Sequence, residues 1–85
     1  MVSQKKAWEL IKERGWTQGS FTNFKGELCL VGALCSAYSY NTTPLFSEAC
    51  KLVSERIRPF YLTQWNDDPS RTKEEVVSLL KELDL

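Results

Sequence analysis

The stretch that most constrains the fold is residues 29–38, CLVGALCSAY, which carries no charge and is apolar on all sides when drawn as a helix. A helix of this kind has to be surrounded by other elements. Gly32 and Ala33 would let a neighbouring helix approach closely. A buried strand is the alternative, because the Cys-Leu-Val triplet fits a sheet, but the length and the Gly-Ala pair favour a helix. The sequence therefore predicts a central helix with the rest of the chain packed around it.

Amphipathic patterns predict further helices on either side of this stretch. The first begins after an N-cap at Ser3 and ends at Gly15, where a helix commonly stops. The next has Pro44 at its first position. It ends before Pro59, because the residue that precedes a proline disfavours the helical conformation. Each pattern places apolar residues on one face and charged residues on the other.

The last helix has the clearest start in the chain. Thr72 and Glu75 have the spacing of a capping box, and apolar residues follow at helical spacing. The least regular part is residues 16–28, where a turn at 23–26 would allow residues 21–22 to pair with 27–28. We therefore predict a mainly α, compact four-helix single domain over residues 1–85. A short β-hairpin between the first two helices is an open alternative.

Composition narrows the class of protein. The chain has 85 residues, enough for one hydrophobic core, and its eleven basic residues balance eleven acidic ones. This balance argues against a protein whose main role is to wrap nucleic acid. Histidine, the commonest metal ligand and general base, is absent. Three cysteines and no secretory signal at the N-terminus indicate a reducing cytoplasm. We expect a cytoplasmic protein without a membrane span, metal or cofactor.

The densest polar constellation surrounds Trp65. In a functional interpretation, Asn66, Asp67 and Arg71 lie around an exposed loop that recognises a partner. In a structural interpretation, Trp65 fills the core, Asn66 and Asp67 turn the chain through local hydrogen bonds, and Arg71 braces a carboxylate. The structural interpretation is favoured, since short polar side chains beside a proline are ordinary in turns. The adjacent acids Asp67 and Asp68 lack the spaced oxygen ligands of a calcium loop.

Two further sites invite the same comparison. Trp16 and Gln18 could line a groove with Trp65, but Trp16 more simply holds the irregular segment in place after the first helix. Gln18 has no evident structural role. Cys29 begins a predicted helix, where the dipole can lower a thiol pKa. Because no histidine can serve as its base, a buried and inert thiol is favoured.

Three motifs occur in order along the chain: Trp16-x-Gln18-Gly19, Gly26-x-x-Cys29-Leu30-x-Gly32-Ala33-Leu34 and Trp65-Asn66-Asp67-x-Pro69-x-Arg71-Thr72. Together they resemble a family of small uncharacterised bacterial and phage proteins, a domain of unknown function with a terminal WND…RT signature. The resemblance spans residues 7–83. It implies that these positions define the domain and that a phage or mobile-element context is to be expected. It supplies no activity, cofactor or catalytic residue.

Three functional hypotheses remain. The first is a non-catalytic protein that binds another protein; an enzyme is disfavoured because no nucleophile–base pair is evident. The second is a weak nucleic-acid binder that uses the basic residues of the first helix, namely Lys5, Lys6, Lys12 and Arg14. The third is a small-ligand or enzymatic site between Trp16 and Trp65. The candidate residues are Trp16, Gln18, Trp65, Asn66, Asp67, Arg71 and Thr72. Burial of Trp65 and bracing of a carboxylate by Arg71 would indicate a folding device.

Overall fold

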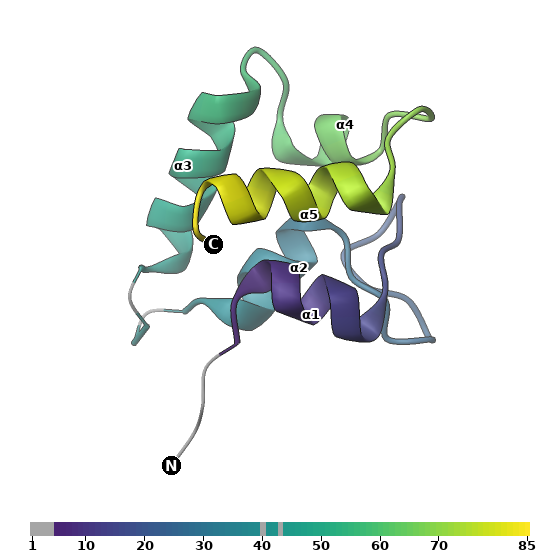
Figure 1. The fold of residues 1–85 in the computed structure, drawn as a ribbon, viewed down its shortest axis with the longest axis horizontal. Coiled ribbons are helices and arrows are strands. Elements are labelled where there is room, and N and C mark those ends of the chain that lie inside the picture. Colours follow the sequence, from purple (N-terminus) through teal and green to yellow (C-terminus); the bar gives the residue numbers. More distant parts are fainter. Residues whose placement is uncertain (1–4, 40, 43) are drawn as a thin grey trace.

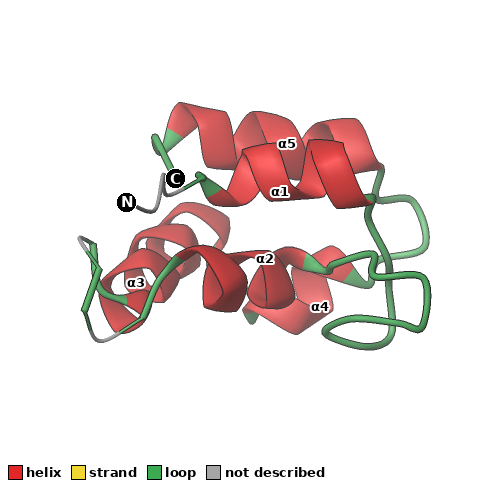
Figure 2. Ribbon diagram, turned by 90° about the horizontal axis from the view of Figure 1, so that it is seen from below, coloured by secondary structure: helices red, strands yellow, loops and turns green. Residues whose placement is uncertain are grey.

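The computed structural model describes residues 5–39, 41–42 and 44–85. The secondary structure of this part of the chain consists of helices, and it contains no β-strand (Figure 1). The helices are α1 (Ala7–Arg14), α2 (Leu30–Ala37), α3 (Phe46–Ile57), α4 (Leu62–Asn66) and α5 (Lys73–Glu82). The antiparallel pair α1 and α5 forms one layer, and α2, α3 and α4 form the layer beneath it (Figure 2). The mainly helical prediction is therefore correct.

Helix α2 is the central element, as predicted, and the strand alternative for this stretch is wrong. It packs against α1, α3 and α4. Its inward residues are buried: Leu30, Gly32, Ala33, Leu34 and Ala37. The helix is not covered on every side, however. Val31 is half-buried, and Cys35 and Ser36 are exposed. One apolar flank of the central helix therefore faces outward.

The prediction of four helices is wrong for the described residues, because Trp65 and Asn66 lie in the additional short helix α4 instead of a loop. This helix begins after Tyr61, whose backbone N–H donates to the Gln64 side chain at 3.1 Å. Five residues are too few to show a helical period in sequence, so packing against α2 and α3 has to stabilise α4.

Two helix starts also differ from prediction, while two helix ends agree with it. Helix α3 begins at Phe46 with Leu45 as its N-cap, so Pro44 precedes the helix instead of opening it. Helix α1 begins at Ala7 with Lys6 as its N-cap, and the predicted N-cap Ser3 lies outside the described residues. The predicted stops hold: α1 ends at Arg14 with Gly15, which has a φ of 100°, as its C-cap, and α3 ends at Ile57, before Pro59. None of the helices in the described part of the chain is long and apolar enough to cross a bilayer.

The segment between α1 and α2 contains the predicted turn but no hairpin strands. The Gly26 backbone N–H donates to the Asn23 carbonyl at 2.9 Å, which closes the turn. Leu28 forms one antiparallel bridge with Thr22 and one parallel bridge with Trp16. Leu28 thus pairs with one segment in the antiparallel direction and with another in the parallel direction. Because each bridge involves a single residue pair, neither pairing extends into a β-ladder.

The segment between α1 and α2 also packs directly against α2. A Cβ atom placed on Gly32 would lie 2.1 Å from the carbonyl oxygen of Phe21. The same oxygen accepts a hydrogen bond from the Cys29 backbone N–H at 3.0 Å. Gly32 is therefore needed for the close approach between the segment and the central helix.

Candidate functional site

The side chain of Asn66 lies at the centre of a polar network and is fully buried. Its Oδ1 accepts from Trp16 Nε1 at 2.7 Å and from the Leu30 backbone N–H at 3.0 Å. Its Nδ2 donates to the Thr17 carbonyl at 3.2 Å and to the Asp67 carboxylate at 2.9 Å. The amide thus uses both acceptor and both donor positions that an asparagine offers. It connects three parts of the chain that are far apart in sequence.

The bond to Leu30 completes the start of α2. The first N–H groups of a helix have no partner within the helix. Cys29 is the N-cap of α2, and its Sγ accepts from the Gly32 N–H at 3.3 Å. Asn66, which lies in α4, accepts a hydrogen bond from the adjacent Leu30 N–H. Its side chain therefore acts as a second N-terminal cap of α2.

Gln18 and Asp67 extend the network toward the surface. Gln18 Nε2 donates to the backbone carbonyls of Asn66 at 2.9 Å and of Asp68 at 2.8 Å. The Asp67 carboxylate accepts from the Gly19 N–H at 3.0 Å. The structural role of Gln18, which the sequence does not reveal, is therefore to bind the carbonyl groups at the end of α4.

Trp65, Arg71 and Thr72 form an adjoining cluster. Trp65 is half-buried and packs against the core. The guanidinium carbon of Arg71 lies 3.8 Å from the centre of the Trp65 ring, and Arg71 Nε donates to the Trp65 carbonyl at 2.9 Å. Arg71 also pairs with Glu75 at 3.2 Å. Thr72 and Glu75 form the predicted capping box of α5. The carboxylate that Arg71 braces is therefore the one in the capping box.

These contacts support a folding device more than a recognition loop. Trp16, Gln18, Asn66 and Asp67 lie in one network, and every buried side-chain nitrogen and oxygen in the described residues has a hydrogen-bond partner. The prediction that Asn66 turns the chain mainly through local bonds is wrong. Its partners include residues 36 and 50 positions earlier. Such long-range bonds cannot be recognised from residue types beside a proline.

The cysteines have different surroundings. Cys29 is buried, and burial raises the pKa of its thiol, an effect that the hydrogen bond from the Gly32 N–H partly opposes. Burial likewise raises the pKa of the Cys50 thiol. Cys35 is exposed. The surroundings of Cys29 are those of an inert thiol instead of an activated nucleophile. Within the described residues, no group of three or more Cys, Asp or Glu side chains is arranged to hold a metal ion.

A surface feature that the sequence did not reveal lies along the outward flank of α2. One hollow, of about 520 Å³, is lined by Arg14, Phe21, Thr22, Leu28, Val31, Gly32, Cys35, Ser36 and Phe46. A second, of about 480 Å³, is lined by Cys35, Tyr38, Ser39, Leu45, Phe46 and Ser47. Because they share Cys35 and Phe46, we treat them as one surface, the α2 groove.

Comparison with known proteins identifies a family for the chain. Residues 5–83 match the model of a family of unknown function (DUF6197). No curated protein matches the chain, and no solved structure matches it.

Proposed function

We propose a protein-binding role without catalysis for this chain, which belongs to the DUF6197 family of unknown function. The observation that carries the proposal is the contrast between two surfaces. The polar motif residues form hydrogen bonds within the molecule, whereas the α2 groove is apolar and open. An exposed apolar surface with a polar rim is typical of a binding site.

The α2 groove has the features of a docking surface. Phe21 is 60% exposed at one end of the groove, and Leu45 is 37% exposed at the other. Between them lie the half-buried Val31 and Phe46 and the exposed Cys35. Aromatic and aliphatic side chains of this kind gain most from being covered by a partner.

The shape and charge of the groove favour an amphipathic helix of another protein as the occupant. The two hollows follow one another along the flank of α2, which suits an elongated apolar face with anchors one and two turns apart. Arg14 is the one charged residue among the described lining residues of either hollow. An acidic side chain at that end of the bound helix would complement it.

The test compares two exposed positions that differ in their relation to the groove. Cys35→Glu introduces a charge into the middle of the groove. Leu52→Glu introduces the same charge at the 42% exposed Leu52 of α3, which lines neither hollow. A protein captured by the wild-type chain would be purified, and its affinity for both variants and its binding segment would be measured.

We expect Cys35→Glu to weaken binding at least about tenfold, because a charge would be buried against the apolar face of the partner, and Leu52→Glu to have little effect. The bound segment should be helical, with apolar residues three and four positions apart. Equal affinity of the two variants, or a partner that binds through a segment without an apolar face, would contradict the proposal.

The other hypotheses have less support. A small-ligand site between Trp16 and Trp65 would need the polar groups of Gln18, Asn66 and Arg71, and these already bond within the chain. A cytoplasmic location and a phage or mobile-element origin remain parts of the proposal. The odd number of cysteines supports the first, and the motif resemblance supports the second.

A further inference from the structure

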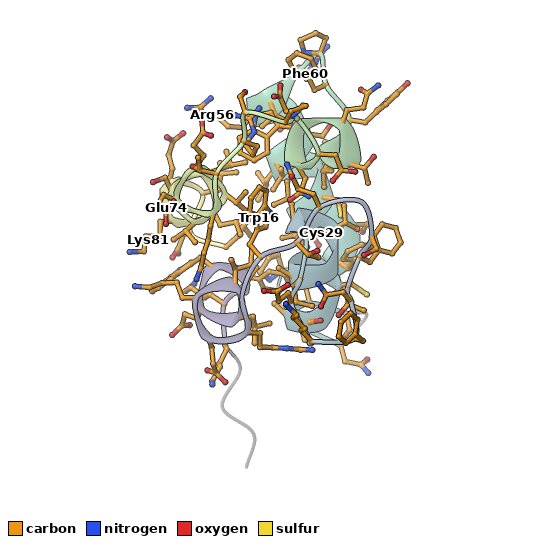
Figure 3. The ribbon with its side chains drawn as sticks, turned by 90° about the vertical axis from the view of Figure 1, so that its right-hand side faces the viewer. Trp16, Cys29, Arg56, Phe60, Glu74 and Lys81 are labelled. Carbon is orange, nitrogen blue, oxygen red and sulfur yellow. The ribbon has the colours of Figure 1, made fainter. Side chains whose placement is uncertain are left out.

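A separate hollow between α1 and α5 is lined by three lysines. It has a volume of about 320 Å³ and is lined by Lys12, Lys73, Glu74, Val77, Ser78 and Lys81. We call it the lysine hollow. Figure 3 shows Glu74 and Lys81 on the outer side of α5, away from Cys29 and α2. The lysine hollow shares no lining residue with the α2 groove.

Two of the ammonium groups converge on one aromatic ring. Lys12 Nζ lies 5.7 Å and Lys81 Nζ lies 4.6 Å from the centre of the Trp8 ring. Each is attracted by the ring, but two like charges held at one ring also repel each other. An anion that binds close to these ammonium groups would reduce this repulsion.

The positive charge of the lysine hollow is not neutralised by ion pairs. Within the described part of the chain, none of its three lysines forms one. By contrast, Lys5 and Lys6 at the start of the chain pair with Glu13 and Asp84. The basic cluster expected on the first helix is therefore partly paired, and Lys12 of that cluster lines the lysine hollow without an ion pair.

Lys73 adds a further positive charge to the lysine hollow. Lys73 is the first residue of α5, where the helix dipole disfavours a cation, and it is half-buried. Glu74 is the one carboxylate among the described lining residues. Three ammonium groups against a single carboxylate leave the lysine hollow positive.

We propose that the lysine hollow binds a ligand through a phosphate-bearing group, such as a diphosphate, whose several oxygens can accept from more than one of the three lysines. Lysine ammonium groups bind phosphate oxygens as point charges, and the hydroxyl of Ser78 can donate a further hydrogen bond. The phosphates can belong to a small molecule or to the backbone of a nucleic acid. The proposal does not depend on the α2 groove.

The test uses calorimetric titration of the full chain at low ionic strength with two probes, inorganic pyrophosphate and a single-stranded oligothymidylate. Lys12→Gln combined with Lys81→Gln removes two charges from the lysine hollow. Lys25→Gln combined with Lys51→Gln removes two charges elsewhere and is the matched control. Chemical shifts of the Trp8 indole N–H report whether a probe reaches the lysine hollow.

We expect saturable binding that the first pair of substitutions weakens at least about tenfold, with less than about threefold weakening in the control. Glu74→Gln should tighten binding, because it removes the opposing carboxylate. Binding of pyrophosphate would assign the site to small phosphate ligands. Binding of the oligonucleotide alone would assign it to nucleic-acid phosphates, and affinity should then fall steeply with salt. No saturable binding of either probe, or equal weakening by both pairs of substitutions, would overturn the proposal.

Discussion

Replacement of Asn66 by alanine is the most direct test of the folding role assigned to the polar network. The substitution removes the two hydrogen bonds that Oδ1 accepts and the two that Nδ2 donates. It leaves the Leu30 N–H without a partner beside a fully buried side chain. Trp16 and Thr17 lose partners as well, but both are half-buried, so water can partly replace the amide.

The expected loss follows from these three orphaned groups. A buried donor or acceptor without a partner costs about 1–3 kcal/mol. Counting the Leu30 group in full and the two half-buried groups at roughly half, Asn66→Ala should lower the free energy of unfolding by about 2–6 kcal/mol. A domain of 85 residues has a total stability of about 4–13 kcal/mol. The loss should therefore be a large part of the total stability.

Urea denaturation monitored by circular dichroism and tryptophan fluorescence measures this loss. With a slope of about 1.3 kcal/mol per M for a small domain, the midpoint should fall by about 1.5–5 M, or the variant should already be unfolded without urea. The matched control is Asn41→Ala, at an exposed position, which should change the stability by less than about 0.5 kcal/mol. A loss below about 1 kcal/mol in Asn66→Ala would refute the role of this amide as the connecting element.

Asn66→Asp tests the effect of a negative charge at position 66 while the shape of the side chain is nearly unchanged. It keeps an acceptor for Trp16 and Leu30 but turns a negative oxygen toward the Thr17 carbonyl and the Asp67 carboxylate. Burial and like charge should raise the pKa of the new carboxyl above its unfolded value of about 3.9. The folded state then binds the proton more tightly, so the variant loses stability relative to wild type as the pH rises above about 4. A loss that is the same at pH 4 and pH 7 would contradict this reasoning.

Three further substitutions test other contacts. Gly32→Ala should lower the melting temperature by more than about 5 °C in spite of the helix propensity of alanine, because its Cβ would lie 2.1 Å from the Phe21 carbonyl oxygen. An unchanged melting temperature would show that the segment between α1 and α2 moves freely. Thr72→Ala removes the N-cap of α5 and should cost about 1 kcal/mol by urea denaturation, whereas Thr72→Ser should retain most of the stability. The hydrogen bond from the Ser70 hydroxyl lowers the pKa of the Asp68 carboxyl, so Ser70→Ala should raise that pKa toward its ordinary value in an NMR titration. The stability linked to the lowered pKa is present above the ordinary carboxyl range and is lost as the pH falls through the lowered value; an Asp68 pKa that does not change would exclude the hydroxyl as the cause.

Features that depend on neighbouring residues could be predicted from the sequence. The capping box of Thr72 and Glu75 and the stop at Gly15 are local signals, and both occur in the structure. The central position of α2 followed from its lack of charge. Helix α4 could not be predicted in this way, because five residues show no period and depend on packing.

The candidate site was only partly predictable for a related reason. The residues around Trp65 could be selected by their types, but three of the four partners of the Asn66 side chain lie 36 to 50 residues away. Gln18 binds across a similar distance. The α2 groove and the lysine hollow depend on which segments of the chain pack side by side. No local sequence pattern predicts that packing.

The cap that Asn66 provides for α2 has a consequence for the order of folding. Contacts between residues far apart in sequence require closure of a long loop before they can form. The Leu30 N–H finds its acceptor 36 positions later, so the first turn of the central helix cannot be complete until α4 has docked. We therefore expect the Leu30 amide to exchange with deuterium when α4 undocks, without unfolding of the whole chain. The most central helix of the molecule would then be among the last to be completed.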